Sequence, residues 1–195
     1  MMRISVWHGD LSDAYLRTVT QLGADCLDFG GGDFWPGVKE QGYPDLDEVV
    51  RIRHRIRSWG LDINRVTLPD VTARFMEDED EAEVENACRA LQVFAEAGIP
   101  IARQRFVGDT FPQQMRRYRS AHRGGYLSRG EQLVRAPQPV PTPEELDTWW
   151  ARFCRVYERL VRIAEEHDIK LALHPSDTPN GETPFGGLGY HRVID

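Results

Sequence analysis

The most constraining feature of the sequence is a repeated boundary between a helical pattern and a short apolar segment. Four such boundaries occur, at Gly23, Gly60, Gly98 and Asp168. The first two intervals are 37 and 38 residues, and the third is 70 residues because it contains an arginine-rich segment, 108–141. Regular alternation of strands and helices is typical of parallel sheets with right-handed crossovers. We therefore predict an α/β fold with about five parallel strands and four to five helices, in a single domain over 1–195, with 108–141 inserted as an irregular basic loop.

The expected elements have recognisable ends. Strands are expected over 3–7, 25–29, 61–68, 99–107 and 171–173. Helices are expected over about 13–22, 46–59, 77–97 and 143–167. Ser12 suits the N-cap of a first helix whose expected inward, apolar face is Tyr15, Leu16, Val19 and Leu22. Thr142 with Glu145 fits a capping box at the start of the last helix. The acidic run 77–85 lies where negative charge complements the helix dipole, so it needs no functional explanation.

Size, charge and cysteine content exclude several classes of protein. The 195 residues can bury a core as one domain, and 41% hydrophobic residues suit a folded protein. A net charge of −7 argues against a nucleic-acid-binding surface, and no apolar run approaches the ~20 residues that span a bilayer. Cys26, Cys88 and Cys154 fit neither a disulfide framework nor a structural zinc site. The N-terminus lacks a secretion signal, so we expect a cytoplasmic protein with no nucleic-acid and no membrane partner.

The C-terminal segment, 170–195, carries the main candidates for chemistry. Pro175 has no N–H to donate to a strand ladder, so we expect His174 to lie at the carboxyl end of a strand, three residues before Asp177. Ligands bind at this end of the strands in parallel α/β folds. A neutral imidazole can bind a divalent metal there, and a nearby carboxylate can orient it. On the His-Pro pair alone, a turn whose polar side chains satisfy loop backbone is the simpler interpretation.

The same segment resembles the HPDDPP…FGLPRI signature of the mannonate dehydratases, lyases of the xylose-isomerase-like barrel group. The residues that carry the resemblance are His174, Pro175, Asp177, Pro179, Phe185, Gly186, Leu188, Arg192, Val193 and Ile194. Two differences from the signature are visible. Ser176 stands where the family usually has an aspartate, and this chain has extra residues, 180–183 and an inserted glycine, within the segment. Further resemblance lies in Trp7-His8-Gly9, in the glycine-rich loop with Trp35, and in 83–91 and 97–100.

The resemblance implies a partial (β/α)8 TIM barrel, since it covers only the front half to two-thirds of the family's length. A complete barrel has eight strands, and five strands alone leave apolar edges at the first and last strand. Three arrangements fit this count: a fragment of a longer chain, a half-barrel that pairs with a copy of itself, and an open, doubly wound sheet. The resemblance favours the fragment.

The resemblance also implies an activity, the metal-dependent dehydration of D-mannonate to 2-keto-3-deoxygluconate with Mn²⁺ or Fe²⁺. It makes His174 a metal ligand, Asp177 a catalytic residue and Arg192 a residue that holds the substrate carboxylate. The family takes its other ligands, a Cys, a second His and an Asp, from later strands, so we expect them beyond residue 195 and expect this chain alone to bind metal weakly or not at all. The alternatives are a sugar-phosphate isomerase or epimerase of the same barrel group, and an inactive truncated module.

Two further candidates lie on earlier strands. His8 ends the first strand, and Arg105 shares one face of the fourth strand with Arg103, because side chains alternate. We expect His8 and Arg105 to contact a small anionic sugar acid. The family commonly has a Tyr-Asn-Phe-Met-like run where this chain reads 104–107 as QRFV, so a different acid or a phosphorylated sugar also fits.

Two loops leave their roles open. The glycine-rich run 30–37 suits either a close approach of backbone to a ligand or a flexible loop. The segment 108–141 holds six arginines (116, 117, 119, 123, 129 and 135) against Asp109 and Glu131. An anionic ligand or partner would suit this charge, and a solvated lid or a homo-oligomer contact is an equal alternative.

Overall fold

The computed structural model describes residues 2–76, 79–105, 115–125, 127–133 and 142–173. The chain divides into two compact units. The first contains Met1–Phe106 and Ala151–His174, and the second contains Val107–Trp150 and Pro175–Asp195. The candidates His174, Asp177 and Arg192 lie outside the described residues, so their roles stay predictions.

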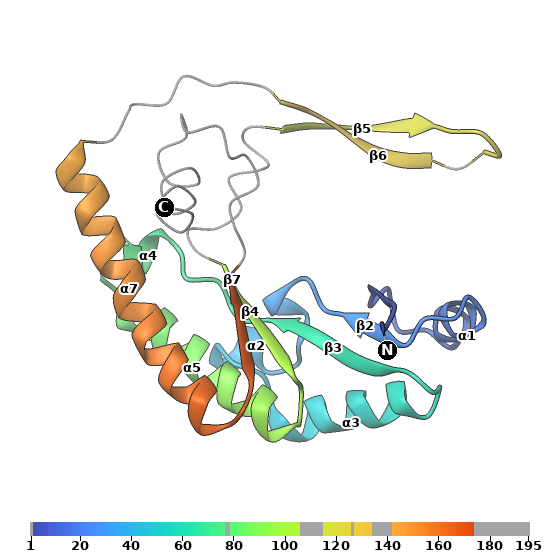
Figure 1. Cartoon of the computed structure of the whole chain (residues 1–195), viewed down its shortest axis with the longest axis horizontal. Coiled ribbons are helices and arrows are strands. Elements are labelled where there is room, and N and C mark those ends of the chain that lie inside the picture. Colours follow the sequence, from blue (N-terminus) through green and yellow to red (C-terminus); the bar gives the residue numbers. More distant parts are fainter. Residues whose placement is uncertain (1, 77–78, 106–114, 126, 134–141, 174–195) are drawn as a thin grey trace. The chain divides into compact units, whose positions relative to one another are not determined.

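A five-stranded parallel sheet in the order β1-β2-β3-β4-β7 forms the centre of the first unit (Figure 1). The strands are β1 (Ser5–Trp7), β2 (Cys26–Asp28), β3 (Asp62–Thr67), β4 (Ile101–Gln104) and β7 (Lys170–Leu173). The register pairs Trp7 with Asp28, and Thr67 with Arg103. The prediction of five parallel strands is confirmed, although the first four strands are shorter than predicted.

Helices connect consecutive strands of this sheet. The long helices are α1 (Asp13–Gln21), α3 (Leu46–Arg57), α5 (Glu81–Glu96) and α7 (Pro143–Glu166). Short helices are η1 (Gly32–Phe34), α2 (Val38–Gln41) and α4 (Ala73–Met76). The predicted caps form: Ser12 Oγ accepts from the Tyr15 amide at 3.2 Å, and Thr142 and Glu145 complete a capping box.

Figure 1 shows α3, α5 and α7 along one side of the sheet. We call this side the helix face and the opposite side the inner face. None of the described helices is both long and apolar enough to cross a membrane.

The core lies on the helix face. Fully buried residues from strands and strand ends are Leu27, Phe29, Val66, Leu68 and Ala102, and those from helices include Leu16, Ile56, Leu91, Phe94 and Leu160. The apolar pattern of the first helix is only partly confirmed. Leu22, which we expected to face inward, is 79% exposed because it is the C-cap residue of α1.

The acidic residues at the start of α5, part of the run 77–85, have a role beyond the helix dipole. Three arginines of α7 pair with them: Arg152 with Glu79 at 3.0 Å, Arg155 with Glu81 at 2.6 Å and Arg159 with Glu85 at 2.7 Å. Exposed ion pairs contribute about 0–1 kcal/mol each. The ion pairs therefore contribute little energy, and buried side chains of α7 such as Val156 and Leu160 contribute most of its packing.

The second unit contains an antiparallel hairpin of β5 (Met115–Ala121) and β6 (Leu127–Leu133). The prediction that this segment is irregular is therefore wrong for 115–133. The turn explains the difference: Gly124 and Gly125 have φ of 83° and 79°, and the Gly125 amide donates to the His122 carbonyl at 3.1 Å. Gly124 is the third residue of this four-residue turn, a position where positive φ favours glycine.

Substitution of Leu16 tests the assignment of the core. Leu16→Ala should lower the free energy of unfolding by about 3 kcal/mol, because it removes a fully buried side chain. Leu22→Ala is the matched control in the same segment and should change it by less than about 0.5 kcal/mol. Urea unfolding followed by circular dichroism measures both, and equal losses for the two variants would contradict the fold.

Candidate functional site

The carboxyl ends of β1 to β4 bring polar side chains together on the inner face. Trp7, Asp28 and Arg65 occupy paired register positions on β1, β2 and β3. Thr67 and Arg103 are paired on β3 and β4. Leu27, Val66 and Ala102 are fully buried and are chain neighbours of Asp28, Arg65 and Arg103. Because side chains alternate along a strand, we assign them to the opposite side of the sheet, the helix face. The inner face is therefore charged where the helix face is apolar.

Asp28 connects three strands. Its Oδ1 accepts hydrogen bonds from Ser5 Oγ at 3.0 Å and from Asn64 Nδ2 at 3.1 Å. Its Oδ2 lies 3.4 Å from Arg65 Nη2. Arg65 is about four-fifths buried, and its Nε and Nη1 have no partner among the described residues. It thus offers hydrogen-bond donors toward the inner face.

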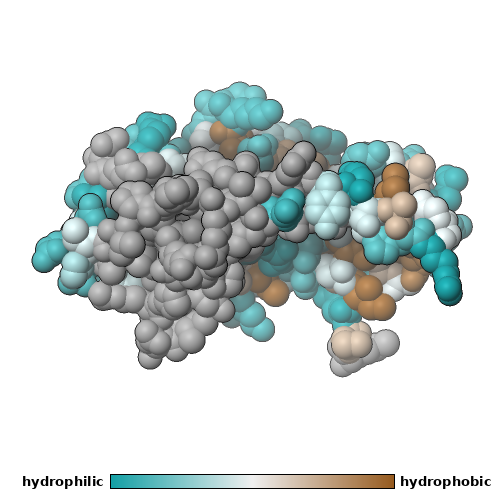
Figure 2. Space-filling view, turned by 90° about the horizontal axis from the view of Figure 1, so that it is seen from above, coloured by the Kyte–Doolittle hydropathy of each residue, from teal (hydrophilic) through white to brown (hydrophobic). Residues whose placement is uncertain are grey.

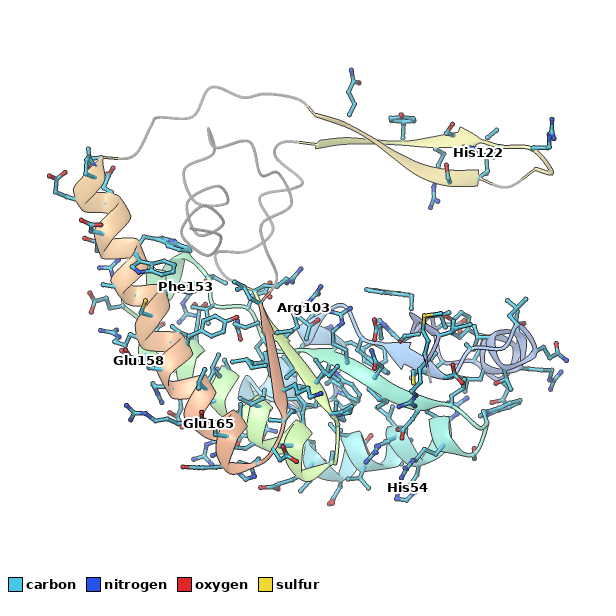
Figure 3. The ribbon with its side chains drawn as sticks, viewed as in Figure 1. His54, Arg103, His122, Phe153, Glu158 and Glu165 are labelled. Carbon is cyan, nitrogen blue, oxygen red and sulfur yellow. The ribbon has the colours of Figure 1, made fainter. Side chains whose placement is uncertain are left out.

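Arg103 links the ends of β2, β3 and β4. Its Nη2 donates to the Gly30 carbonyl and to Thr67 Oγ1, both at 3.0 Å. Thr67 Oγ1 in turn donates to the Phe29 carbonyl at 2.9 Å. Figure 3 shows Arg103 close to the point where β4 ends. A guanidinium group is thereby fixed at the edge of the sheet where parallel α/β folds bind ligands.

Arg105, a predicted substrate-binding residue, forms a two-point ion pair with Asp70. Its Nε lies 2.9 Å from Oδ1 and its Nη2 lies 2.7 Å from Oδ2. Both side chains are about a quarter exposed. Its Nη1 has no partner among the described residues. The pair orients the guanidinium group and leaves one nitrogen available for an anion.

His8, the other predicted residue that the structure describes, is packed among aromatic rings. It is 6% exposed. Its ring lies 4.6 Å from Phe29 in a stacked arrangement, 4.5 Å from Phe34 and 4.7 Å from Trp7, measured between centroids. Its Nδ1 lies 3.2 Å from the Asp28 carbonyl, which fits a proton on Nδ1. Burial lowers the pKa of His8, and this hydrogen bond opposes the shift in part. The expected contact between His8 and a substrate stays a prediction.

The glycine-rich run makes close contacts with protein groups. A Cβ on Gly30 would lie 1.8 Å from the Trp7 ring, and a Cβ on Gly32 would lie 2.4 Å from the Leu68 carbonyl oxygen. These glycines therefore let the loop after β2 pack against the ends of β1 and β3. Trp7 remains 58% exposed with its ring against Gly30, and so presents an aromatic surface beside the arginines.

Sequence reasoning found part of this site. It identified Arg105 and placed Arg103 on the same strand face, but it gave no role to Asp70, Asp28 or Arg65. The sequence did contain one indication of their roles, because Asp28 and Asp70 lie near the ends of predicted strands. The pairings themselves depend on strand register, because Asp70 and Asp28 lie 35 and 37 residues from their arginines.

The described residues do not form a metal centre. They contain no group of three or more His, Cys, Asp or Glu side chains that could hold a metal ion. The predicted ligand, His174, lies outside the described residues. The described part of the chain therefore gives no basis for assigning a catalytic role to a metal.

Comparisons with known proteins bear on the fold. No protein-family model matches the chain, and no curated protein matches it. Among solved structures, mannonate dehydratase from Streptococcus suis serotype 2 has a TM-score of 0.68 at 19% identity, covering 95% of this chain and 56% of that one.

Two other solved structures are similar. A putative sugar phosphate isomerase/epimerase from Anabaena variabilis has a TM-score of 0.55 at 17% identity, covering 90% of this chain and 54% of its own. A xylose isomerase-like TIM barrel protein from Mycobacterium smegmatis, in complex with magnesium, has a TM-score of 0.52 at 20% identity, covering 93% and 52%. The chain thus spans about half the length of these structures. At these identities the likeness shows the fold, and the chain folds as part of a TIM barrel.

The pH dependence of stability tests the environment of His8. Because its pKa is lowered in the folded protein, the unfolded chain binds a proton more readily, and His8 contributes stability that is lost as pH falls below about 6.5. His8→Phe keeps an aromatic ring and removes this titration. The unfolding free energy of the unsubstituted protein should therefore fall more between pH 7.5 and 5.5 than that of the variant, and parallel losses in urea unfolding would argue against a buried neutral imidazole.

Proposed function

We propose that this chain contributes the anion-binding part of an enzyme that dehydrates a sugar acid, converting D-mannonate to 2-keto-3-deoxygluconate. The observation that carries the proposal is the group of three guanidinium groups, Arg65, Arg103 and Arg105, at the carboxyl ends of β3 and β4. They face two carboxylates, Asp28 and Asp70, so the five groups together are positive. A barrel end of this charge suits an anionic sugar derivative.

The chemistry requires charge stabilisation next to the substrate carboxylate. The proton to be removed lies on the carbon adjacent to that carboxylate and is weakly acidic, and its removal places negative charge on the carboxylate oxygens. Fixed guanidinium donors stabilise such charge as it develops. Arg105 is oriented by Asp70 and Arg65 by Asp28, so both can donate without first losing side-chain freedom.

A divalent metal is part of this proposal. The sequence resemblance implies Mn²⁺ or Fe²⁺, and one similar solved structure contains magnesium. His174 as a ligand, Asp177 as the catalytic carboxylate, and Arg192 and His8 as substrate-binding residues complete the proposed site. The geometry of the described residues supports only the anion-binding part.

An isomerase or epimerase acting on a sugar phosphate is the second candidate. The same guanidinium groups suit a phosphate, since arginine binds planar carboxylates and phosphates alike. A putative sugar phosphate isomerase/epimerase is also among the similar folds. The two candidates differ in the anion they bind and in the product they form.

A binding experiment on the substrate class distinguishes these candidates. Titration of the chain with D-mannonate, D-fructose and D-fructose 6-phosphate, each with Mg²⁺ or Mn²⁺, should show binding of mannonate and no binding of the neutral ketose. Replacing the pair together, Arg105→Gln with Asp70→Asn, should weaken mannonate binding about 10-fold, because a charge-assisted hydrogen bond contributes roughly 1.5–3 kcal/mol.

The matched control is Arg51→Gln, an exposed residue on α3 that pairs with Glu48, and it should not change binding. Preference for the phosphorylated ketose over mannonate would replace the dehydratase proposal with the second candidate. Binding of D-fructose as tightly as mannonate would contradict both.

Metal binding provides a separate test. Because the described residues hold no metal cluster and His174 is the one ligand expected in this chain, isothermal titration of the 195-residue chain with Mn²⁺ should give weak binding or none. Tight, stoichiometric binding would contradict this expectation and would show that the chain carries a full set of ligands.

A further inference from the structure

We propose that the β5–β6 hairpin is an arm through which the chain associates with a second copy of itself, docking on an acidic row of helix α7. The proposal concerns assembly and does not depend on the proposed activity. It rests on the charge of the hairpin, on an exposed aromatic ring beside an arginine, and on a complementary surface elsewhere in the same chain.

The charge of the hairpin is opposite to that of the rest of the chain. Residues 115–133 contain five of the 24 Lys and Arg residues and one of the 31 acidic residues. The rest of the chain therefore carries 19 basic and 30 acidic side chains. A basic arm on an otherwise acidic chain is attracted to another copy of that chain.

The hairpin presents an aromatic side chain in a fixed position. The Tyr118 ring lies across Gly130 of the opposite strand, where an added Cβ would come within 2.3 Å of it. Tyr118 is nevertheless 53% exposed, and the neighbouring Arg119 is exposed as well. Tyrosine and arginine are enriched among the residues that contribute most to protein interfaces.

The hairpin has only two strands, and a two-stranded hairpin by itself is marginally stable in water. It would therefore gain stability from an acidic surface that packs against it.

Helix α7 carries a surface on which the hairpin of a second copy can dock. Glu158, Val161 and Glu165 are exposed and follow one another at helical spacing, so they form one row along the helix. The exposed Arg162 lies beside this row, while Arg152, Arg155 and Arg159 are paired with the acidic residues at the start of α5. Val161 is 40% exposed, and Figure 3 shows both glutamates on α7. The two carboxylates match basic side chains of the hairpin, and the valine between them offers an apolar contact for Tyr118.

The composition of the surface agrees with a mixed, charged contact. On the face shown in Figure 2, hydrophilic residues dominate the described surface and hydrophobic residues occur in small groups. Two copies related by a two-fold axis would make this hairpin-to-helix contact twice, which is the commonest symmetry of soluble oligomers. A nucleic acid is the competing occupant of a basic ribbon, and the net charge of −7 opposes it.

Sedimentation velocity of the 195-residue chain at low and high salt tests the proposal. We expect a dimer at low salt that dissociates as salt is raised. Tyr118→Ala and Arg119→Glu on the hairpin, and the double variant Glu158→Arg with Glu165→Arg on α7, should each raise the dissociation constant at least about 10-fold. Arg119, Glu158 and Glu165 are exposed, so circular dichroism should show unchanged folding for the variants at these three positions.

Mixing the hairpin variant with the helix variant is the decisive part of the experiment. An equimolar mixture of the Arg119→Glu variant with the Glu158→Arg, Glu165→Arg variant should regain association, because the altered hairpin then meets the altered helix. Arg51→Glu, on α3, makes the same charge change as Arg119→Glu and should leave the dimer intact.

Three results would overturn the proposal. The first is a monomer at every concentration and salt, and the second is association that the hairpin variants leave unchanged. The third is a monomer that binds a labelled oligonucleotide through Arg119, which would assign the ribbon to nucleic acid instead.

Discussion

Arg103 ties together the ends of three strands, and the candidate site depends on that link. Its guanidinium group donates to the Gly30 carbonyl after β2 and to Thr67 Oγ1 at the end of β3, while its own backbone belongs to β4. The parallel register that sets Thr67 opposite Arg103 makes these contacts possible. A shift of one residue would turn Arg103 toward the apolar helix face, where a charge is costly to bury.

The candidate site depends on the difference in polarity between the two faces of the sheet. The helix face buries Leu27, Val66 and Ala102, which leaves the inner face free to carry charge. There, Asp28 and Asp70 each orient an arginine, and together with Arg103 they place positive charge where the strands end. The fold thus supplies oriented donors for an anion, and the proposed sugar acid or sugar phosphate rests on these donors.

Much of the fold could be predicted from the sequence, because its signals are local. Glycines at Gly23, Gly60 and Gly98 end helical patterns, and all three adopt positive φ. The caps at Ser12 and Thr142 form as predicted. The hairpin was missed because its strands have no continuous apolar run, and the paired glycines at the turn were its main signal. Leu22 was misplaced because apolar spacing continues one residue past the end of α1.

The site was less predictable, because it depends on contacts between residues far apart in the chain. Alternation along the fourth strand predicts that Arg103 and Arg105 share a face, but nothing local pairs Arg105 with Asp70 or Arg65 with Asp28. The burial of His8 likewise depends on Phe29 and Phe34 closing around it.

Nuclear magnetic resonance of the arginine side chains tests the central claim most directly. The Nε–H signals of Arg65, Arg103 and Arg105 would be followed during titration with D-mannonate. If these groups form one anion site, their signals should shift together and saturate at the same ligand concentration. Unchanged signals while backbone amides elsewhere respond would show that the anion binds at a different place, and would contradict the account.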